Sequence, residues 1–193
     1  MKSICVYCGS SPGGRPEFAE GARALGRVLV ERDLQLVYGG GRVGLMGIVA
    51  DAMLELGGQV IGVIPKVLAT RELAHPGLSQ MHVVGSMHQR KALMAELSDA
   101  FVAMPGGIGT FDELFEIWTW GQLGLHRKPC GLLNVHRFYD GLVRFLDHAA
   151  AEGFLQPLHR QMLIEAACPA ELLDRLAEYQ PPATRQWIHE EDL

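Results

Sequence analysis

A glycine-rich loop with a nearby carboxylate occupies residues 105–113, where the sequence is PGGIGTFDE. The apolar run AFVAM precedes it and a helical pattern follows it. A strand that ends in glycines and leads into a helix places free backbone N–H groups around an anion such as a phosphate. Glu113 comes one helical turn later, where its charge can face a cationic centre that develops during a reaction. The segment therefore predicts chemistry on a small phosphorylated molecule.

Glu113 also has a structural interpretation. Thr110 and Glu113 have the spacing of a capping box, in which both side chains accept hydrogen bonds from backbone N–H groups at a helix start. A capping box requires neither a proline nor three glycines before it, but both interpretations stay open at this point. Glutamine serves a capping box and carries no charge, so Glu113→Gln separates the two roles.

Two adjacent bases follow a second helix start, in the segment SMHQRK at 86–91. Ser86 and Gln89 form a capping box, which places Arg90 and Lys91 in the first turns of the helix. The helix dipole disfavours positive charge there by a few tenths to about 1 kcal/mol, so the bases indicate an anion or carboxylate partner. A solvated pair is the alternative. Arg90 lies about 100° around the helix from Lys91, so one base can enter a site and the other support it. Met94 is a candidate for contact with a flat base, or else a core residue.

A second glycine cluster follows the expected second strand. Gly39, Gly41 and Gly44 match the pattern G-x-G-x-x-G of dinucleotide sites. Such sites also need an acid about 20 residues further on, and residues 64–66 there are Ile-Pro-Lys. We therefore favour a mononucleotide site or a close backbone approach that involves Gly39, Gly40 and Gly41. A structural tight turn is the alternative.

Other chemical motifs are incomplete. Cys5 and Cys8 fit C-x-x-C, but Cys5 lies inside the expected first strand and does not open a helix, so redox chemistry is not favoured. No second cysteine pair completes a zinc site, and the eight histidines form no i, i+4 pair with one another. We expect neither a metal nor an organic cofactor. Trp118 and Trp120 are expected in the core or in an interface.

Short apolar runs alternate with longer helical patterns along the chain. Helices of this length between strands are the crossovers of a parallel sheet. We predict an α/β fold, a Rossmann-like doubly wound parallel sheet with three layers, α/β/α, in a single domain over residues 1–180. The expected strands span 4–7, 34–38, 60–64, 81–84, 101–104 and 130–134. The expected helices span 16–32, 45–56, 87–97, 111–123, 139–152 and 169–179, with 162–166 a last strand or a turn and 181–193 a tail.

The composition narrows the class of protein. The chain has 193 residues, 48% of them hydrophobic, which mildly favours a buried oligomer interface. A net charge of −5 argues against binding to nucleic acid, which needs a clustered basic face. We find no run of membrane-spanning length and no signal-peptide core, and four cysteines are too few for a secreted disulfide framework. We expect a cytoplasmic protein with no membrane partner.

These segments together are similar to one known family. The segments that show the similarity are CVYCGSS at 5–11, YGGGRVGLMG at 38–47, IPK at 64–66, RE at 71–72, MHQRK at 87–91 and the highly specific P-G-G-x-G-T-x-x-E at 105–113. Over nearly its whole length the chain closely resembles the LOG ("Lonely Guy") family of cytokinin riboside 5′-monophosphate phosphoribohydrolases. Members have often been labelled lysine decarboxylases, but no lysine here stands in a recognisable pyridoxal phosphate setting.

The resemblance implies a cofactor-free, Rossmann-type homodimer that cleaves the N-glycosidic bond of adenine-type nucleoside 5′-monophosphates, releasing free base and ribose 5-phosphate. It assigns the catalytic arginine to Arg90 and the catalytic glutamate to Glu113. At 111–112 this chain has Phe-Asp where many members have Leu-Glu. The nucleotide contacts that the resemblance implies are Glu72, Lys91, Gly106, Gly107, Ile108, Gly109, Thr110, Phe111, Asp112 and Thr119. Ser10, Gly39, Gly40, Gly41 and Met94 are further candidate substrate contacts.

The implied reaction agrees with the chemistry of the loop. Breaking a ribose–base bond builds oxocarbenium character, which a fixed carboxylate such as that of Glu113 stabilises. Binding of the 5′-phosphate positions the sugar, so nucleosides without phosphate should be poor substrates. Two alternatives stay open: a non-catalytic nucleotide-binding carrier or sensor module, and an NAD-dependent oxidoreductase.

Overall fold

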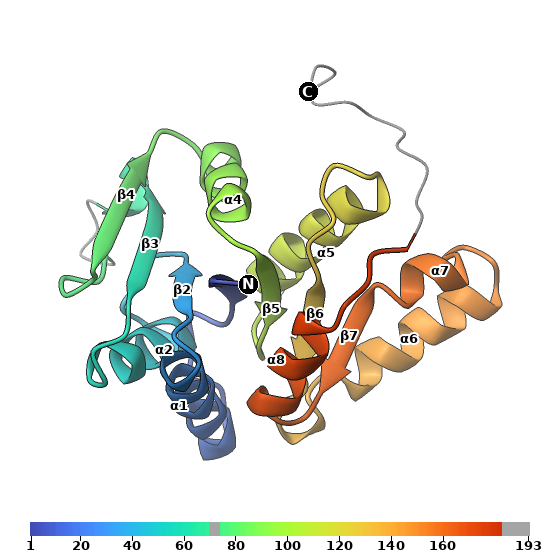
Figure 1. The fold of residues 1–193 in the computed structure, drawn as a ribbon, viewed down its shortest axis with the longest axis horizontal. Helices are drawn as coiled ribbons and strands as arrows, with labels where there is room; N and C mark the ends of the chain where they lie inside the picture. Colours follow the sequence, from blue (N-terminus) through green and yellow to red (C-terminus); the bar gives the residue numbers. More distant parts are fainter. Residues whose placement is uncertain (70–73, 183–193) are drawn as a thin grey trace.

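The computed structural model describes residues 1–69 and 74–182. Within them, parallel strands form one sheet in the order β4-β3-β2-β1-β5-β6-β7 (Figure 1). The sheet order reverses between β1 and β5, so the loops after these two strands leave toward opposite faces and a crevice forms between them. The strands are β1 (Ser3–Tyr7), β2 (Gln35–Tyr38), β3 (Val60–Pro65), β4 (Gln80–Val84), β5 (Ala100–Ala103), β6 (Cys130–Leu133) and β7 (Leu163–Ala166).

Helices cover both faces of the sheet, which confirms the predicted three-layer α/β fold (Figure 1). One face carries α1 (Pro16–Glu31), α2 (Gly44–Leu54) and α8 (Pro169–Ala177). The other carries α4 (Met87–Glu96), α5 (Ile108–Gln122) and α6 (Asp140–Ala151). The short helices α3 (Lys66–Ala69) and α7 (Pro157–Arg160) and the 3-10 turn η1 (Val135–Arg137) complete the described elements.

The central strand β1 contributes to two separate cores. Ile4, Val6 and Cys8 face α1, α2 and α8, whereas Cys5 and Tyr7 face α4, α5 and α6. Such burial on both faces is typical of a parallel sheet. Burial raises the pKa of both thiols, to about 12 for Cys5. Cys5 and Cys8 are therefore protonated packing residues in different cores, in agreement with the interpretation of C-x-x-C as non-redox.

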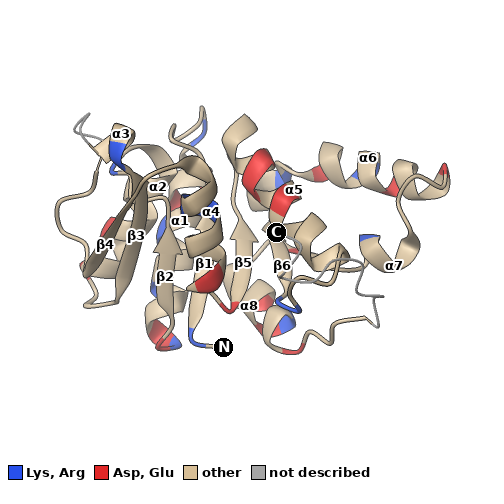
Figure 2. Ribbon diagram, turned by 90° about the horizontal axis from the view of Figure 1, so that it is seen from above, with Lys and Arg blue, Asp and Glu red and all other residues tan. Residues whose placement is uncertain are grey.

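Charged residues are dispersed over the surface. In the ribbon of Figure 2, the blue positions of lysine and arginine are scattered among the red positions of aspartate and glutamate and do not gather on one element. Among the described helices, none is both long and apolar enough to span a lipid bilayer.

The expected strands and long helices are all present, with displaced ends. The segment around 162–166 is the strand β7, and α3, α7 and η1 were not expected. Elements of three or four residues are too short to show a hydrophobic period. The largest displacement concerns α5, which begins at Ile108 and not at residue 111.

The early start of α5 overturns the capping-box interpretation of Thr110 and Glu113. Gly107 is the N-cap residue, with no side-chain cap, so Thr110 already lies inside the helix. The other expected box is largely confirmed, because the Ser86 hydroxyl accepts a hydrogen bond from the Gln89 N–H at 3.2 Å. The Gln89 side chain accepts one from the N–H of Gly85, one residue before the cap.

Gly44 provides a test of the packing at the crevice. Its φ is +61°, and a Cβ there would lie 2.2 Å from the carbonyl carbon of Ser10. We expect Gly44→Ala to lower the free energy of unfolding by about 1–3 kcal/mol or more. Gly141→Ala is the control, because that glycine is in α6 with open space around it, and it should gain up to about 1 kcal/mol. Urea denaturation measures both, and equal stability of the two variants would contradict the packing described.

Candidate active site

Gly9 joins the loops at the crevice between β1 and β5. Its N–H donates to the carbonyl of Pro105 at 3.0 Å, and its carbonyl accepts from the N–H of Leu45, in the first turn of α2, at 2.9 Å. A Cβ on Gly9 would lie 3.0 Å from the carbonyl oxygen of Ser11 and 3.3 Å from the Cα of Gly106. The glycine therefore allows three segments that are distant in sequence to meet.

A buried ion pair lies beside this junction. Nη1 of Arg90, on α4, is 2.7 Å from Oε1 of Glu113, on α5, and both side chains are 11% exposed. Nε of Arg90 donates to the carbonyl of Val63, in β3, at 3.2 Å. Glu113 thus pairs with Arg90, a residue that the sequence analysis assigned to the same site.

The second glycine cluster makes room for the arginine. A Cβ at Gly39 would lie 2.0 Å from Nη2 of Arg90, closer than any real contact. Gly39, Gly40 and Gly41 line neither of the two pockets found at the crevice. Of the interpretations of this cluster, the geometry supports the close backbone approach, with the guanidinium group as the neighbour that approaches.

Arg90 and Glu113 line a pocket of about 260 Å³. The N-cap Gly107 and the first turn of α5, Ile108, Gly109 and Thr110, form one wall, and Ser10, in the loop after β1, also lines the pocket. The N–H groups of a first helical turn have no partner within the helix. The pocket therefore combines an anion-binding helix end with a fixed carboxylate and a fixed guanidinium.

Burial raises the pKa of Glu113 above its ordinary value of 4.5. The positive charge of Arg90 and its hydrogen bond oppose this effect without cancelling it. Glu113 is thus a carboxylate that protonates more readily than an exposed one, in a site where it also contacts a permanent cation.

Lys91 pairs with two other carboxylates and not with Glu113. Its Nζ lies 2.9 Å from Asp112 and 2.9 Å from Glu116, both on α5. Burial alone would lower the pKa of Lys91, but the two carboxylates outweigh it and raise the pKa. The prediction of carboxylate partners for Arg90 and Lys91 is therefore confirmed, with Arg90 as the base that enters the pocket.

The remaining expected contacts lie in several places. Met94 is fully buried among core residues, so its assignment as a substrate contact is corrected to a core position. Phe111 packs edge-on against Tyr139 at 6.3 Å. Thr119 is exposed near the end of α5, and Glu72 lies outside the described residues. Gly106 lines the second pocket at the crevice.

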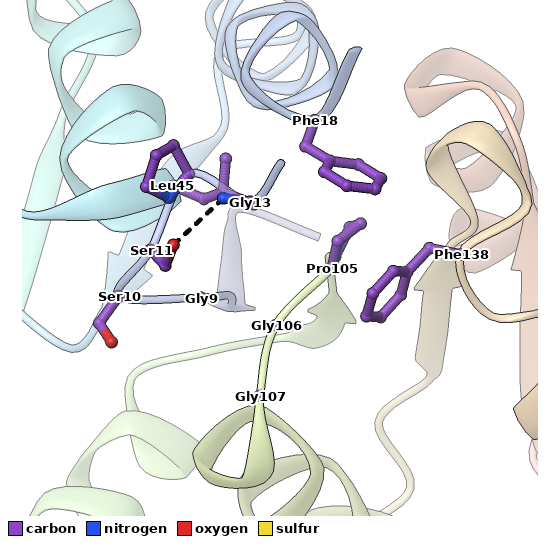
Figure 3. Close-up of a pocket in the computed structure, with 11 residues that line it drawn as sticks. Gly9, Ser10, Ser11, Gly13, Phe18, Leu45, Pro105, Gly106, Gly107 and Phe138 are labelled. Carbon is purple, nitrogen blue, oxygen red and sulfur yellow. Dashed lines mark hydrogen bonds between the residues drawn. The ribbon is translucent and has the colours of Figure 1, made fainter. Parts of the chain in front are cut away.

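This second pocket, of about 230 Å³, has aromatic and apolar walls (Figure 3). Phe18 and Phe138 meet edge-on at 5.7 Å on one side, and the loops after β1 and β5 form the other. It shares Gly9, Ser10 and Gly107 with the pocket of Glu113. The sequence analysis missed it, because its walls come from segments that only the fold brings together.

Phe138 follows a backbone segment with unusual dihedral angles. His136 and Arg137 have φ of 50° and 60°, in the left-handed region. Asn134 accepts a hydrogen bond from the N–H of Tyr139 at 2.7 Å, and the Tyr139 hydroxyl donates to the carbonyl of Met104 at 2.6 Å. These bonds hold the segment against the end of β5 and fix the aromatic wall.

Over residues 1–69 and 74–182, no three His, Cys, Asp or Glu side chains gather as metal ligands would.

Solved structures share this fold. The chain matches a molybdenum cofactor binding protein from the phototrophic bacterium Rippkaea orientalis with a TM-score of 0.70 and 20% identity, covering 92% of this chain and 97% of that one. It matches a Moco carrier protein from Chlamydomonas reinhardtii with a TM-score of 0.68 and 20% identity, covering 92% and 96%. At this identity the similarity establishes the architecture alone.

Sequence relatives are much more similar. The family model described as possible lysine decarboxylase matches residues 46–176. The cytokinin riboside 5′-monophosphate phosphoribohydrolase LOG7 of Arabidopsis thaliana is 52% identical over 181 residues, which cover 94% of this chain and 83% of the relative. A phosphoribohydrolase of the same name from Rhodococcoides fascians is 53% identical over 164 residues, covering 84% and 83%. The chain therefore belongs to the LOG family of cytokinin riboside 5′-monophosphate phosphoribohydrolases.

Proposed function

We propose that this protein hydrolyses the N-glycosidic bond of adenine-type nucleoside 5′-monophosphates, including cytokinin ribosides, and releases free base and ribose 5-phosphate. The observation that carries the proposal is the buried Arg90–Glu113 pair in the wall of a pocket formed by the first turn of α5. The names of relatives that are about half identical to this chain support the same reaction.

The first turn of α5 holds the 5′-phosphate in this proposal. Its N–H groups and the positive end of the helix dipole favour an anion. Apart from adjacent residues and the backbone of the helix itself, no atom lies within 4 Å of the Cβ positions of Gly107 and Gly109, so the backbone is open to close approach. Binding of the phosphate then supplies free energy that positions the ribose beside Glu113.

Glu113 acts on the sugar as the bond breaks. The electron pair of the C1′–N bond leaves with the base, and C1′ gains positive charge that the carboxylate stabilises. A water oxygen then bonds to C1′, and Glu113 accepts the proton that this water loses. The departing base takes up one proton on the nitrogen that held C1′, and loss of the proton from Glu113 restores the carboxylate. Arg90 holds the carboxylate at 2.7 Å and fixes its orientation.

The other interpretations lack comparable support. None of the four lysines of the chain lines either crevice pocket, and Lys91 and Lys128 are hydrogen-bonded elsewhere, so a Schiff-base decarboxylase has no candidate nucleophile there. A non-catalytic carrier or sensor would use the same helix end but would not need the charge of Glu113. Substitution of Glu113 therefore separates an enzyme from a carrier.

The direct test is incubation of purified protein with AMP and with isopentenyl-AMP, followed by chromatography for free base and an assay for ribose 5-phosphate. We expect both products in equal amounts from nucleotides, and much less base from the matching nucleosides, because these lack the phosphate. If no nucleoside monophosphate yields base, the proposed reaction is wrong.

Glu113→Gln should fold and bind nucleotide but lose about 10² to 10³ in kcat, the usual loss for one well-placed electrostatic group. The amide keeps the shape of the side chain and removes the charge that faces the sugar. Steady-state kinetics and a thermal unfolding curve measure the two effects. Glu171→Gln, on the distant helix α8, is the matched control and should retain wild-type kcat. Retention of full activity by Glu113→Gln would favour the carrier interpretation.

The pH dependence of kcat should reflect the burial of Glu113. The reaction needs the carboxylate, so kcat falls as the pH drops through the pKa of this group. Because burial raises that pKa, the acid limb should lie above 4.5, the ordinary value. A pH–rate profile measures the limb, and unfolding curves at each pH show that the protein stays folded. An acid limb at or below 4.5 would contradict the assignment.

A homodimer and a cytoplasmic location also belong to this proposal. Large apolar side chains that are exposed in the monomer support an interface between copies: Val83, Met87 and Ile108 are 58%, 43% and 82% exposed. The buried, unpaired state of Cys5, Cys8 and Cys130 fits a reducing compartment.

A further inference from the structure

His75 forms contacts with the glycine loop and with α2. Its backbone N–H donates to the backbone carbonyl of Gly40 at 2.9 Å, and the preceding residue, Ala74, forms an antiparallel bridge with Gly41. Its imidazole is 9% exposed and its Nε2 lies 2.9 Å from Oδ1 of Asp51. Sequence analysis assigned no role to this histidine.

The hydrogen bonds of the imidazole define its tautomer. Nδ1 accepts from the N–H of Gly77 at 3.1 Å, so it carries no proton. The proton must then be on Nε2, where it donates to the carboxylate of Asp51. Both ring nitrogens are satisfied in the neutral form, as expected for a residue that fixes local structure.

The backbone of the glycine loop connects the contacts of His75 with the Arg90–Glu113 pair. Gly40 has a φ of +72°. A Cβ there would lie 3.2 Å from Sδ of Met81 and 3.3 Å from Cβ of Ile64. The adjacent Gly39 is the residue whose Cβ would lie 2.0 Å from Nη2 of Arg90. The position of this backbone therefore limits where the guanidinium group lies.

We propose that His75 is a positioning residue for Arg90, acting through the backbone of Gly39 and Gly40, with Asp51 holding the imidazole in place. The proposal rests on the proposed function, because Arg90 matters to kcat only if the protein is a hydrolase. Its consequence is that a histidine outside the pocket controls the orientation of the Arg90–Glu113 pair.

The test compares His75→Ala with His75→Gln, whose amide N–H replaces the Nε2 donor toward Asp51. We expect His75→Ala to lose about 10- to 100-fold in kcat, because small displacements of catalytic groups have effects of that size. The KM for the nucleotide and inhibition by ribose 5-phosphate should change much less. His75→Gln should recover part of kcat. Equal kcat for wild type and His75→Ala would overturn the proposal.

Asp51→Ala gives a second measurement if His75→Ala does not fold. The Asp51 side chain is 59% exposed, so its removal leaves the core intact. We expect a smaller loss of kcat in the same direction. His148→Ala removes an exposed histidine–glutamate pair on α6 and should leave kcat unchanged. If Asp51→Ala has wild-type kcat, the contact between His75 and Asp51 does not position Arg90.

A double-mutant cycle distinguishes positioning from general stability. In an Arg90→Lys background, the guanidinium group is absent, so His75→Ala should cost much less kcat than in the wild type. Fully additive losses would show that His75 acts independently of Arg90. If the wild-type protein itself releases no base, the proposed function fails first, and that result is distinct from any outcome for His75.

Discussion

The contact between Arg90 and Glu113 imposes the strongest requirement on the surrounding structure. Both charged side chains are only 11% exposed, so they lose most of their hydration. The attraction between them offsets the free-energy cost of that loss. Removing one partner from such a pair typically costs about 3–5 kcal/mol. The geometry therefore requires α4, α5 and the ends of β2 and β3 to meet at one point, since Val63 and Gly39 contact the same guanidinium group.

The two glycine-rich loops satisfy different steric requirements. Gly107 and Gly109 have no neighbour within 4 Å of a Cβ position, so their backbone is free to approach a ligand. Gly39 and Gly44 have the opposite environment, because a Cβ would collide with Arg90 in one case and with Ser10 in the other. One loop has an open backbone beside the pocket, and the other leaves space for the guanidinium group of Arg90.

Much of this architecture follows from sequence patterns. Apolar runs at regular spacing predicted the strands. The glycines at the start of α5, with Arg90 and Glu113, predicted residues that line the pocket, whereas Lys91 pairs with carboxylates outside it. The start of α5 was misplaced because Thr110 and Glu113 also satisfy a local capping pattern. Met94 was assigned to the site because helical spacing does not distinguish a core face from a pocket face. The approach of Gly39 to Arg90 and the contacts of His75 depend on chain crossings, which local spacing does not encode.

The position of β1 in the middle of the sheet has a consequence for the order of folding. Its residue Ile4 pairs with Leu36 of β2 on one side and with Ala100 of β5 on the other. The first pairing closes a short loop, whereas the second spans half of the chain and forms more slowly. During synthesis from the N-terminus, the first half of the sheet can therefore assemble before the glycine loop at 105–113 is made. Hydrolytic competence then arises late, when β5 docks against a strand that was synthesised first.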